Sequence, residues 1–271
     1  MYNPTVPFEF EGRKYMGVRV ESLRSELDSK TCFAYEEDAD KWIMDPSINS
    51  LSLQDPSYAK IKGESVILGV KAWEEDNSIG WRQDIYRGNS IRDLDYFTSG
   101  PIGMKDIRLV DLEDRIGVFT RPQGKIGGKG KIGYLEIGKI DELENLTESD
   151  WYSAKIVENL FNDNHWGGVN QAIKLPNGEI GIIGHIAYQT INERNQLEKH
   201  YRAIAFRFNP ETNEHSGFKI IAKRSDFPSS PSKRGSELED VIFSAGIDEA
   251  NNFYAGVSDF CIGRENIEYP F

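Results

Sequence analysis

The chain has 271 residues, 38% of them hydrophobic and 28% charged, so it can bury a core and differs from a disordered chain. Its formal net charge of −12 at pH 7 disfavours nucleic acid or an anionic membrane as a partner, because both bind basic surfaces. No apolar run approaches the roughly 18 residues of a membrane span, no secretion signal is visible, and the only two cysteines form no disulfide framework. We therefore expect one cytoplasmic domain over residues 1–271.

Predicted β-strands follow one another along the chain. Runs rich in β-branched and aromatic residues, each bounded by turns, occupy residues 66–73, 115–121, 179–185 and 201–208. The pair Asn177-Gly178 is typical of a tight hairpin turn, because both residues adopt positive φ angles readily. A helical segment is a candidate only within residues 141–158, and the Pro- and Ser-rich segment 225–236 is predicted to be an exposed loop. The expected fold class is all-β.

A hairpin pattern recurs four times. Each copy opens on a polar residue, turns and returns as an apolar strand, and the copies begin at Asp55, Asp106, Asn170 and Asp240. Their starts lie 51 to 70 residues apart, which fits a four-stranded blade with its loops better than a sandwich. With a fifth copy that the pattern does not reveal, such as one shared between the termini, the period predicts a five-bladed β-propeller. The alternative is a β-sandwich with coincidental hairpins.

Polar residues at the heads of innermost blade strands converge on one central channel. Aspartate is a poor strand former, so its repetition at Asp55, Asp106 and Asp240 favours a shared carboxylate pocket. The structural alternative is that each carboxylate caps a local turn. Grouped carboxylates suit cleavage of a glycosidic bond, in which one protonates the leaving oxygen and a second group, or an external anion, supports the attack.

Other polar residues are candidates for substrate binding. Residues 162–171 place a tryptophan among amides, glycines and a histidine, which suits stacking on a sugar ring, and the candidates there are Asn164, His165, Trp166 and Gln171. The alternative is that Trp166 packs between blades and His165 bonds a backbone carbonyl. Four basic residues close to the strand heads are candidates for an anionic group: Arg82, Lys105, Arg108 and Arg121. His185 is expected either in the channel or in the core.

Known metal and hydrolase motifs are absent from the sequence. It contains no HExxH, no CxxC and no Gly-x-Ser-x-Gly, and its four histidines are scattered. We predict no metal site and no cofactor, apart from inorganic phosphate as a conceivable co-substrate.

Two segments resemble motifs of glycoside hydrolase family 130, which comprises five-bladed mannoside phosphorylases and mannosidases. Residues 104–108, Met-Lys-Asp-Ile-Arg, resemble its Glu-Asp-Pro-Arg motif, with Ile107 in place of proline and Lys105 in place of the acidic residue. Residues 253–263 resemble its closing Tyr-Gly-Ala-Ala-Asp segment, and Asp259 matches the final aspartate. Residues 17–21, 164–171 and 269–271 resemble an uncharacterised bacterial family assigned to the glycosidases.

The resemblance implies a pocket at the channel mouth and an inverting mechanism with an aspartate as the acid. Our leading hypothesis is an enzyme that cleaves a glycosidic bond by hydrolysis or phosphorolysis, with Asp106 as the principal catalytic carboxylate and Asp55 and Asp240 beside it. A small oligosaccharide or glycoside is the expected partner, and the oligomeric state is not predicted. The alternatives are a non-catalytic sugar-binding propeller and a protein-interaction propeller.

Overall fold

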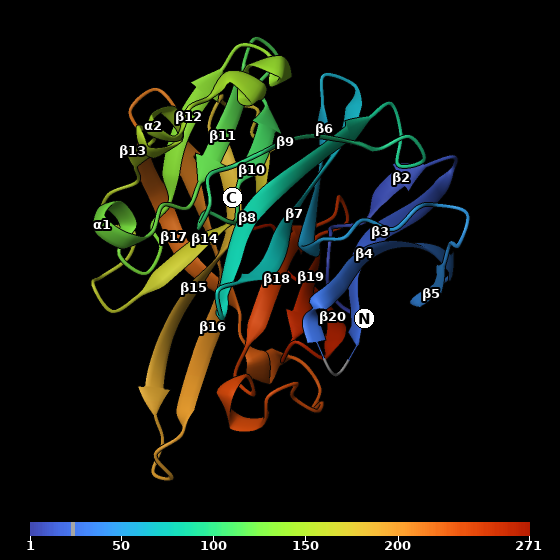
Figure 1. The fold of residues 1–271 in the computed structure, drawn as a ribbon, viewed down its shortest axis with the longest axis vertical. Coiled ribbons are helices and arrows are strands. Elements are labelled where there is room, and N and C mark those ends of the chain that lie inside the picture. Colours follow the sequence, from blue (N-terminus) through green and yellow to red (C-terminus); the bar gives the residue numbers. More distant parts are fainter. Residues whose placement is uncertain (23–24) are drawn as a thin grey trace.

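The protein is a five-bladed β-propeller, seen in a computed structural model that describes residues 1–22 and 25–271 (Figure 1). Five antiparallel sheets surround a central channel, and the strands of each sheet run outward in chain order. The expected fold class and blade number are therefore confirmed. Among the described residues, no helix has the length and apolarity needed to span a bilayer.

The four hairpins found in the sequence are the inner strand pairs of blades 2 to 5. Blade 2 contains β6 (Gln54–Ile61), β7 (Glu64–Glu75), β8 (Ser78–Gly88) and β9 (Asp95–Ser99). Blade 3 contains β10 (Arg108–Asp111), β11 (Ile116–Thr120), β12 (Gly133–Ile137) and β13 (Lys155–Ile156). Its connections hold α1 (Gly124–Gly127), the 3₁₀ helix η1 (Ile140–Asn145) and α2 (Glu148–Tyr152), the last two within the predicted helical segment.

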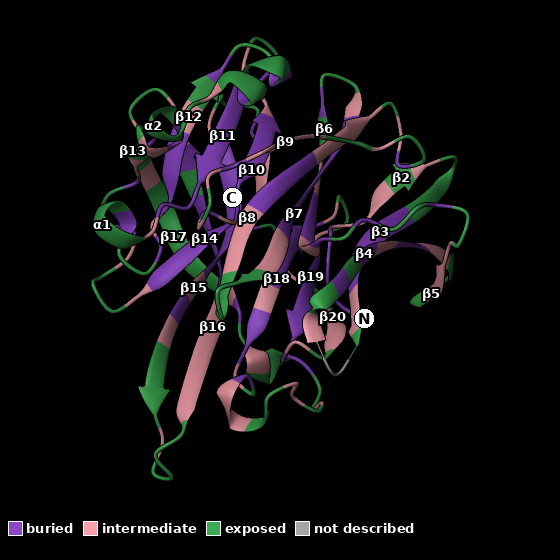
Figure 2. Cartoon of the chain, in the orientation of Figure 1, coloured by how far each residue is buried: buried purple, intermediate pink, exposed green. Residues whose placement is uncertain are grey.

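Blades 4 and 5 follow blade 3 in the chain. Blade 4 contains β14 (Trp166–Lys174), β15 (Ile180–Ile191), β16 (Leu197–Asn209) and β17 (Glu214–Ala222). Its β15–β16 hairpin projects beyond the other strands and has an exposed end (Figure 2). The connection to blade 5 holds η2 (Arg224–Asp226) and η3 (Gly235–Glu237), and blade 5 contains β18 (Ile242–Ile247), β19 (Asn252–Val257) and β20 (Cys261–Asn266).

Blade 1 is the copy that the sequence pattern does not reveal. It is built entirely from the N-terminal part of the chain and is not shared between the termini: β1 (Tyr2–Pro4), β2 (Phe8–Phe10), β3 (Arg13–Ser22), β4 (Ser25–Asp38) and β5 (Lys41–Met44). The partner of β3 is broken into two three-residue strands, and the register of β1 shifts between Tyr2 and Pro4. Strands of three residues are too short to show the alternation of apolar and polar residues, so the hairpin repeat cannot be recognised in blade 1.

The hydrophobic core is divided into five clusters, one between each pair of neighbouring blades. Between blades 3 and 4, the rings of Phe119, Tyr134 and Phe208 have centroids 4.8 to 5.4 Å apart, and Phe208 meets the other two edge to face. Buried aromatic rings of this kind contribute about 1.5–3 kcal/mol each through the hydrophobic effect. The ring of blades is thus held together by packing, which leaves the channel free for polar groups.

Candidate active site

A cavity of about 220 Å³ lies where the blades converge, and all five blades contribute to its walls. Four acidic side chains line it: Glu26, Asp55, Asp106 and Asp259. Five basic side chains line it as well: Arg19, Lys105, Arg121, Lys199 and Arg234. In a chain of net charge −12 this is a local excess of cations, so the cavity suits a ligand that carries hydroxyl groups together with a negative charge.

A larger cavity, of about 490 Å³, lies between blades 1 and 5. Its walls are mainly apolar and include Met16, Trp42 and Tyr254, and its charged groups are the mutual ion pair of Arg264 with Asp40. It lacks convergent carboxylates and unpaired cations, so the smaller polar cavity is the candidate active site.

The backbone is left-handed at four polar residues of the pocket. The φ angles are 46° at Asn3, 48° at Asp55, 58° at Asp106 and 49° at Asp259. Asparagine and aspartate tolerate this region better than other non-glycine residues, and such conformations cluster at functional sites. The unusual backbone turns each side chain away from its sheet and into the channel.

Asp106 is buried among cations. Its Oδ2 accepts a hydrogen bond from Nη1 of Arg121 at 3.1 Å and lies 3.9 Å from Nε2 of His185, while Nη2 of Arg108 lies 4.0 Å from its Oδ1. Burial alone would raise the pKa of the Asp106 carboxyl, but the charges of Arg121 and its neighbours hold this pKa at about 2. Among these cations Asp106 is therefore ionised.

Lys105 is the half-buried cation next to Asp106. It makes no hydrogen bond or ion pair with any other residue that the structure describes. Its charge nevertheless lowers the pKa of both Asp55 and Asp106. An ammonium group with no fixed partner beside buried carboxylates is available to a ligand anion.

His185 is neutral in the pocket wall. Its Nδ1 lies 2.9 Å from Oδ1 of Asn170, and its ring stacks on Tyr201 with centroids 5.5 Å apart. Burial lowers the pKa of His185 to about 3, more strongly than the Asp106 charge raises it. His185 therefore supplies a neutral imidazole and does not titrate near neutral pH.

Asp55 and Asp259 form a second carboxylate group. Both accept from Nδ2 of Asn3, at 2.7 and 3.4 Å, and Nη1 of Arg19 contacts Asp55 at 3.0 Å. Burial would raise the pKa of Asp55, but Arg19, Asn3 and Lys105 together lower it. Burial and the charge of Asp55 raise the pKa of Asp259. The pKa values of the two neighbouring carboxyl groups are thus shifted in opposite directions, so Asp55 ionises before Asp259 as the pH rises.

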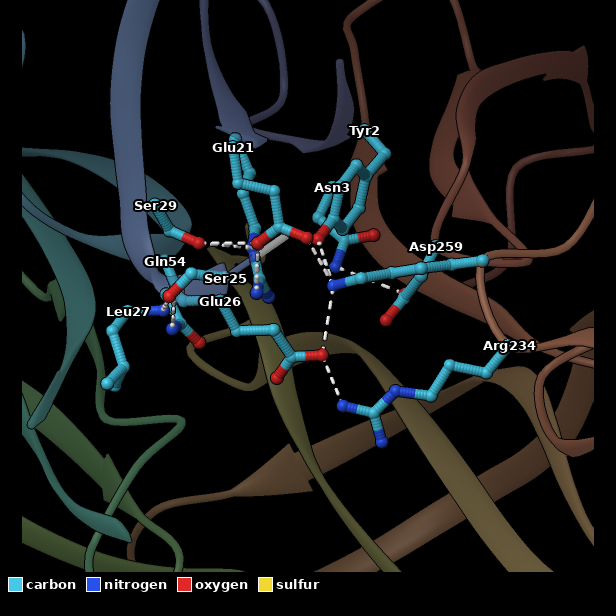
Figure 3. A network of polar contacts seen from close by, with 12 residues as sticks. Tyr2, Asn3, Glu21, Ser25, Glu26, Leu27, Ser29, Gln54, Arg234 and Asp259 are labelled. Atoms are coloured by element: carbon cyan, nitrogen blue, oxygen red, sulfur yellow. Dashed lines mark hydrogen bonds and ion pairs between the residues drawn. The ribbon is translucent and has the colours of Figure 1, made fainter. Parts of the chain in front are cut away.

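An ion-pair network ties the blade 4–5 connection to blade 1 at the edge of this pocket (Figure 3). Lys233 pairs with Glu21 and Glu26, and Arg234 pairs with Glu26. Nζ of Lys233 also donates to the Tyr2 hydroxyl at 2.9 Å. The segment 225–236 was expected to be simply an exposed loop, but Arg234 in it lines the pocket.

Asp240 does not line the pocket, which corrects the expectation that it joins Asp55 and Asp106. Its carboxylate accepts from Nη2 of Arg202 at 2.6 Å and contacts Nδ1 of His200 at 2.7 Å. Asp240 lies two residues before β18, as Asp106 does before β10, so its position along the chain does not exclude it from the pocket; its contacts with Arg202 and His200 of β16 hold it elsewhere. Blade 5 instead supplies Asp259, from the turn between β19 and β20.

The structure also places several predicted sugar-binding residues away from the pocket walls. Trp166 is buried, and its indole donates to the hydroxyl of Tyr201, a residue of the same blade, at 3.2 Å. The His165 ring contacts the Asn162 side chain and the Tyr188 ring, and the His165 backbone N–H donates to the Asn162 carbonyl at 3.0 Å. The other predicted binding residues outside the pocket walls also have hydrogen-bond partners within the protein. The Asn164 backbone N–H donates to the Asn162 side chain, and the Gln171 amide bonds the Ile247 backbone. Arg82 donates to Asp84, and Arg108 donates to the Asn170 carbonyl.

Sequence reasoning missed several pocket residues, among them Asn3, Arg19, Glu26, Lys199, Tyr201 and Arg234. Arg19 had a usable signal, because it interrupts an apolar strand and is followed two positions later by Glu21, on the same face. Asn3 had none, since it lies in a strand of three residues.

The whole chain, residues 1–271, matches the family described as "Protein of unknown function (DUF1861)". No curated protein sequence matches significantly. Among solved structures, the chain is similar to MPT-4, a mannose phosphorylase from Leishmania mexicana in complex with phosphate ion. The two are 33% identical with a TM-score of 0.90, and the match covers 100% of this chain and 84% of the MPT-4 chain. MPT-1, a GDP-Man-dependent mannosyltransferase from the same organism, is 34% identical with a TM-score of 0.89, at coverages of 100% and 85%.

A more distant structure shares the fold. The β-1,2-mannobiose phosphorylase from Listeria innocua is 13% identical with a TM-score of 0.67, and the match covers 97% of this chain and 88% of the other. The propeller, predicted from the repeated hairpins, and the resemblance to mannose phosphorylases, predicted from two short motifs, are confirmed. The chain is a five-bladed β-propeller that belongs to the DUF1861 family.

Proposed function

We propose that this protein is a mannoside phosphorylase, which transfers a mannosyl group from a small mannoside to inorganic phosphate in the channel pocket. The observation that carries the proposal is Lys105, a cation without a fixed partner, beside the Asp106–Arg121 ion pair. A hydrolase needs only water at this position, whereas a phosphorylase must bind a dianion.

Phosphate binding would also favour the protonated form of Asp106, in which it can act as the catalytic acid. Arg121 holds Asp106 ionised. A phosphate dianion bound by Lys105 and Arg121 shares these cations and adds negative charge near Asp106. At about 4 Å and an effective dielectric constant of about 20, one unit charge contributes about 4 kcal/mol, which corresponds to about 3 pKa units. From its value of about 2, the pKa of Asp106 would rise to about 5 with one added charge, and the second charge of the dianion would raise it further, toward neutral pH.

The reaction is a single displacement. A phosphate oxygen attacks the anomeric carbon, the bond from that carbon to the leaving oxygen breaks, and the leaving oxygen takes the proton of Asp106. The proton of the hydrogen phosphate ion returns to the Asp106 carboxylate, so the products are mannose 1-phosphate and the shortened glycoside. One displacement inverts the anomeric configuration. Asp55 and Asp259 would bind sugar hydroxyls.

The relatives support a mannosyl substrate but do not select the second substrate. One, at 33% identity, is a mannose phosphorylase bound to phosphate, and another, at 34%, is a GDP-Man-dependent mannosyltransferase. The decisive experiment therefore offers manno-oligosaccharides of defined linkage with and without phosphate, and GDP-mannose with the same acceptors in a parallel reaction. Mannose 1-phosphate formed only with phosphate is the expected result.

Other outcomes would overturn the proposal in specific ways. Mannose released at the same rate without phosphate indicates a hydrolase, and transfer from GDP-mannose alone indicates a transferase. A sugar that raises the melting temperature without being consumed indicates a binding propeller. Lys105→Ala should raise the apparent KM for phosphate at least about tenfold, since it removes a charge-assisted contact worth about 1.5–3 kcal/mol. Lys219→Ala, at an exposed lysine of β17, is the matched control.

A further inference from the structure

Asn3 occupies an unusual position for a residue so close to the N-terminus. It is 3% exposed, lies where the register of β1 and β3 shifts, and has a left-handed backbone. Its side chain therefore leaves the blade 1 sheet and reaches between blades 2 and 5. There it meets Asp55, at the start of β6. It also meets Asp259, at the β19–β20 turn (Figure 3).

The amide nitrogen of Asn3 can donate a hydrogen bond to both carboxyl groups. Nδ2 carries two hydrogens, and it lies 2.7 Å from Oδ1 of Asp55 and 3.4 Å from Oδ1 of Asp259. The reverse orientation would point the carbonyl oxygen at two carboxylates, so the amide is held in one orientation by charge.

The other end of the amide is unsatisfied. Oδ1 of Asn3 is buried and has no hydrogen-bond partner among the described residues. It lies over Gly256, where an added Cβ would come within 1.7 Å of this oxygen. A buried acceptor without a partner costs free energy, and a glycine is needed to admit it. Both costs are understandable if the amide nitrogen is required in the pocket.

We propose that Asn3 is a positioning residue of the active site, whose amide nitrogen holds the Asp55 and Asp259 carboxyl groups together as a pair that shares one proton. The charges around the pair agree with this role. Arg19 contacts Asp55 and not Asp259, and the pKa of Asp259 is raised by burial and by the neighbouring charge of Asp55. The N-terminal strand thus both completes blade 1 and builds the site.

A carboxylate beside a carboxylic acid presents an acceptor next to a donor, which matches two neighbouring hydroxyl groups of a sugar. This use of the pair rests on the proposed function, whereas the pairing itself does not. If the pair binds substrate in its singly protonated form, turnover should fall at low pH, where Asp55 takes up a proton, and at high pH, where Asp259 loses its own.

The test is a carboxyl titration followed by ¹³C NMR on protein labelled at aspartate. Asp55→Asn and Asp259→Asn identify the two resonances. In the wild type, the pair should titrate in two steps, one below and one above the ordinary aspartate value of 3.8. Asn3→Ala should raise the lower step by about one pH unit or more, because Asp55 loses its amide donor. Asn3→Asp, which adds a charge, should raise it further.

Thr5→Ala is the matched control for folding. Thr5 lies just beyond β1, and its Oγ1 accepts from the Gly17 backbone at 3.0 Å without touching either carboxylate. This variant should lose stability and keep both titration steps. If Asn3→Ala does not fold, Asn3→Ser, with a shorter donor, should fold and raise the lower step by less. The proposal fails if the Asn3 variants titrate like the wild type, or if Thr5→Ala shifts the steps equally.

The enzymatic readout separates this proposal from the proposed function. The acidic limb of kcat/KM against pH should move by the same amount as the lower NMR step in each Asn3 variant. If the wild type has no phosphorylase activity, the proposed function fails, and the NMR titration still decides the role of Asn3. If the wild type is active and the steps do not move, only the role of Asn3 fails.

Discussion

Removing the Asp106 charge should change how stability depends on pH. The wild-type carboxyl has a pKa of about 2 in the folded protein against an ordinary value of 3.8. Because the folded-state pKa is the lower one, ionisation stabilises the fold above pH 3.8, and this stabilisation is lost as the pH falls toward 2. The difference corresponds to about 2 kcal/mol at neutral pH, of which about 1 kcal/mol is already lost at pH 3.

Asp106→Asn isolates this contribution. The amide keeps the shape of the side chain but does not titrate, while all other carboxyl groups titrate in both proteins and largely cancel in the difference. Urea unfolding of the wild type and the variant at pH 7, 5, 4 and 3 gives that difference in free energy of unfolding. It should be constant from pH 7 to 5 and then shift by about 1 kcal/mol against the wild type by pH 3. A difference that stays constant down to pH 3 would refute the assignment of Asp106 as a cation-stabilised carboxylate.

Three further predictions concern packing, the site and the corrected assignment. Phe208→Ala should lower the free energy of unfolding by about 3–5 kcal/mol, since it empties the ring cluster between blades 3 and 4; a loss below about 1 kcal/mol in urea unfolding would contradict the packing. Gly256→Ala should reduce kcat/KM at least as much as Asn3→Ala, because its Cβ overlaps the Asn3 amide, and unchanged turnover would argue against that contact. Asp240→Asn should leave kcat/KM within about twofold, whereas Asp259→Ala, which removes the carboxyl group that pairs with Asp55, should lower it at least about tenfold, as loss of a buried hydrogen-bond partner does; the opposite order would restore Asp240 to the site.

The blades could be predicted because their information is local. A hairpin depends on a turn and two flanking strands, so its pattern survives in the sequence wherever both strands are long enough. Blade 1 escaped notice for the same reason, since β1 and β2 have three residues each. Asp55 and Asp106 were found because Asp55 is the second residue of the inner strand β6 and Asp106 lies two residues before the inner strand β10.

The remaining site residues depend on how the ring closes, which no short pattern records. Asp240 and Asp259 both belong to the blade 5 region, and only the turn geometry decides that the second reaches the channel. Trp166 follows polar and exposed residues and precedes two glycines, so it resembles a loop tryptophan, yet it begins β14 and is buried. The role of Asn3 depends on a contact with Asp259, 256 positions away in the chain.

The central claim is that phosphate is a substrate whose binding protonates Asp106. The most direct measurement is the formation of mannose 1-phosphate from manno-oligosaccharides, with phosphate varied, in the wild type and in Asp106→Asn. We expect a product that saturates with phosphate in the wild type and is reduced at least about 1000-fold in the variant, as removal of an essential acid predicts. Equal rates in the two proteins, or a rate of mannose release that does not depend on the phosphate concentration, would contradict this mechanism.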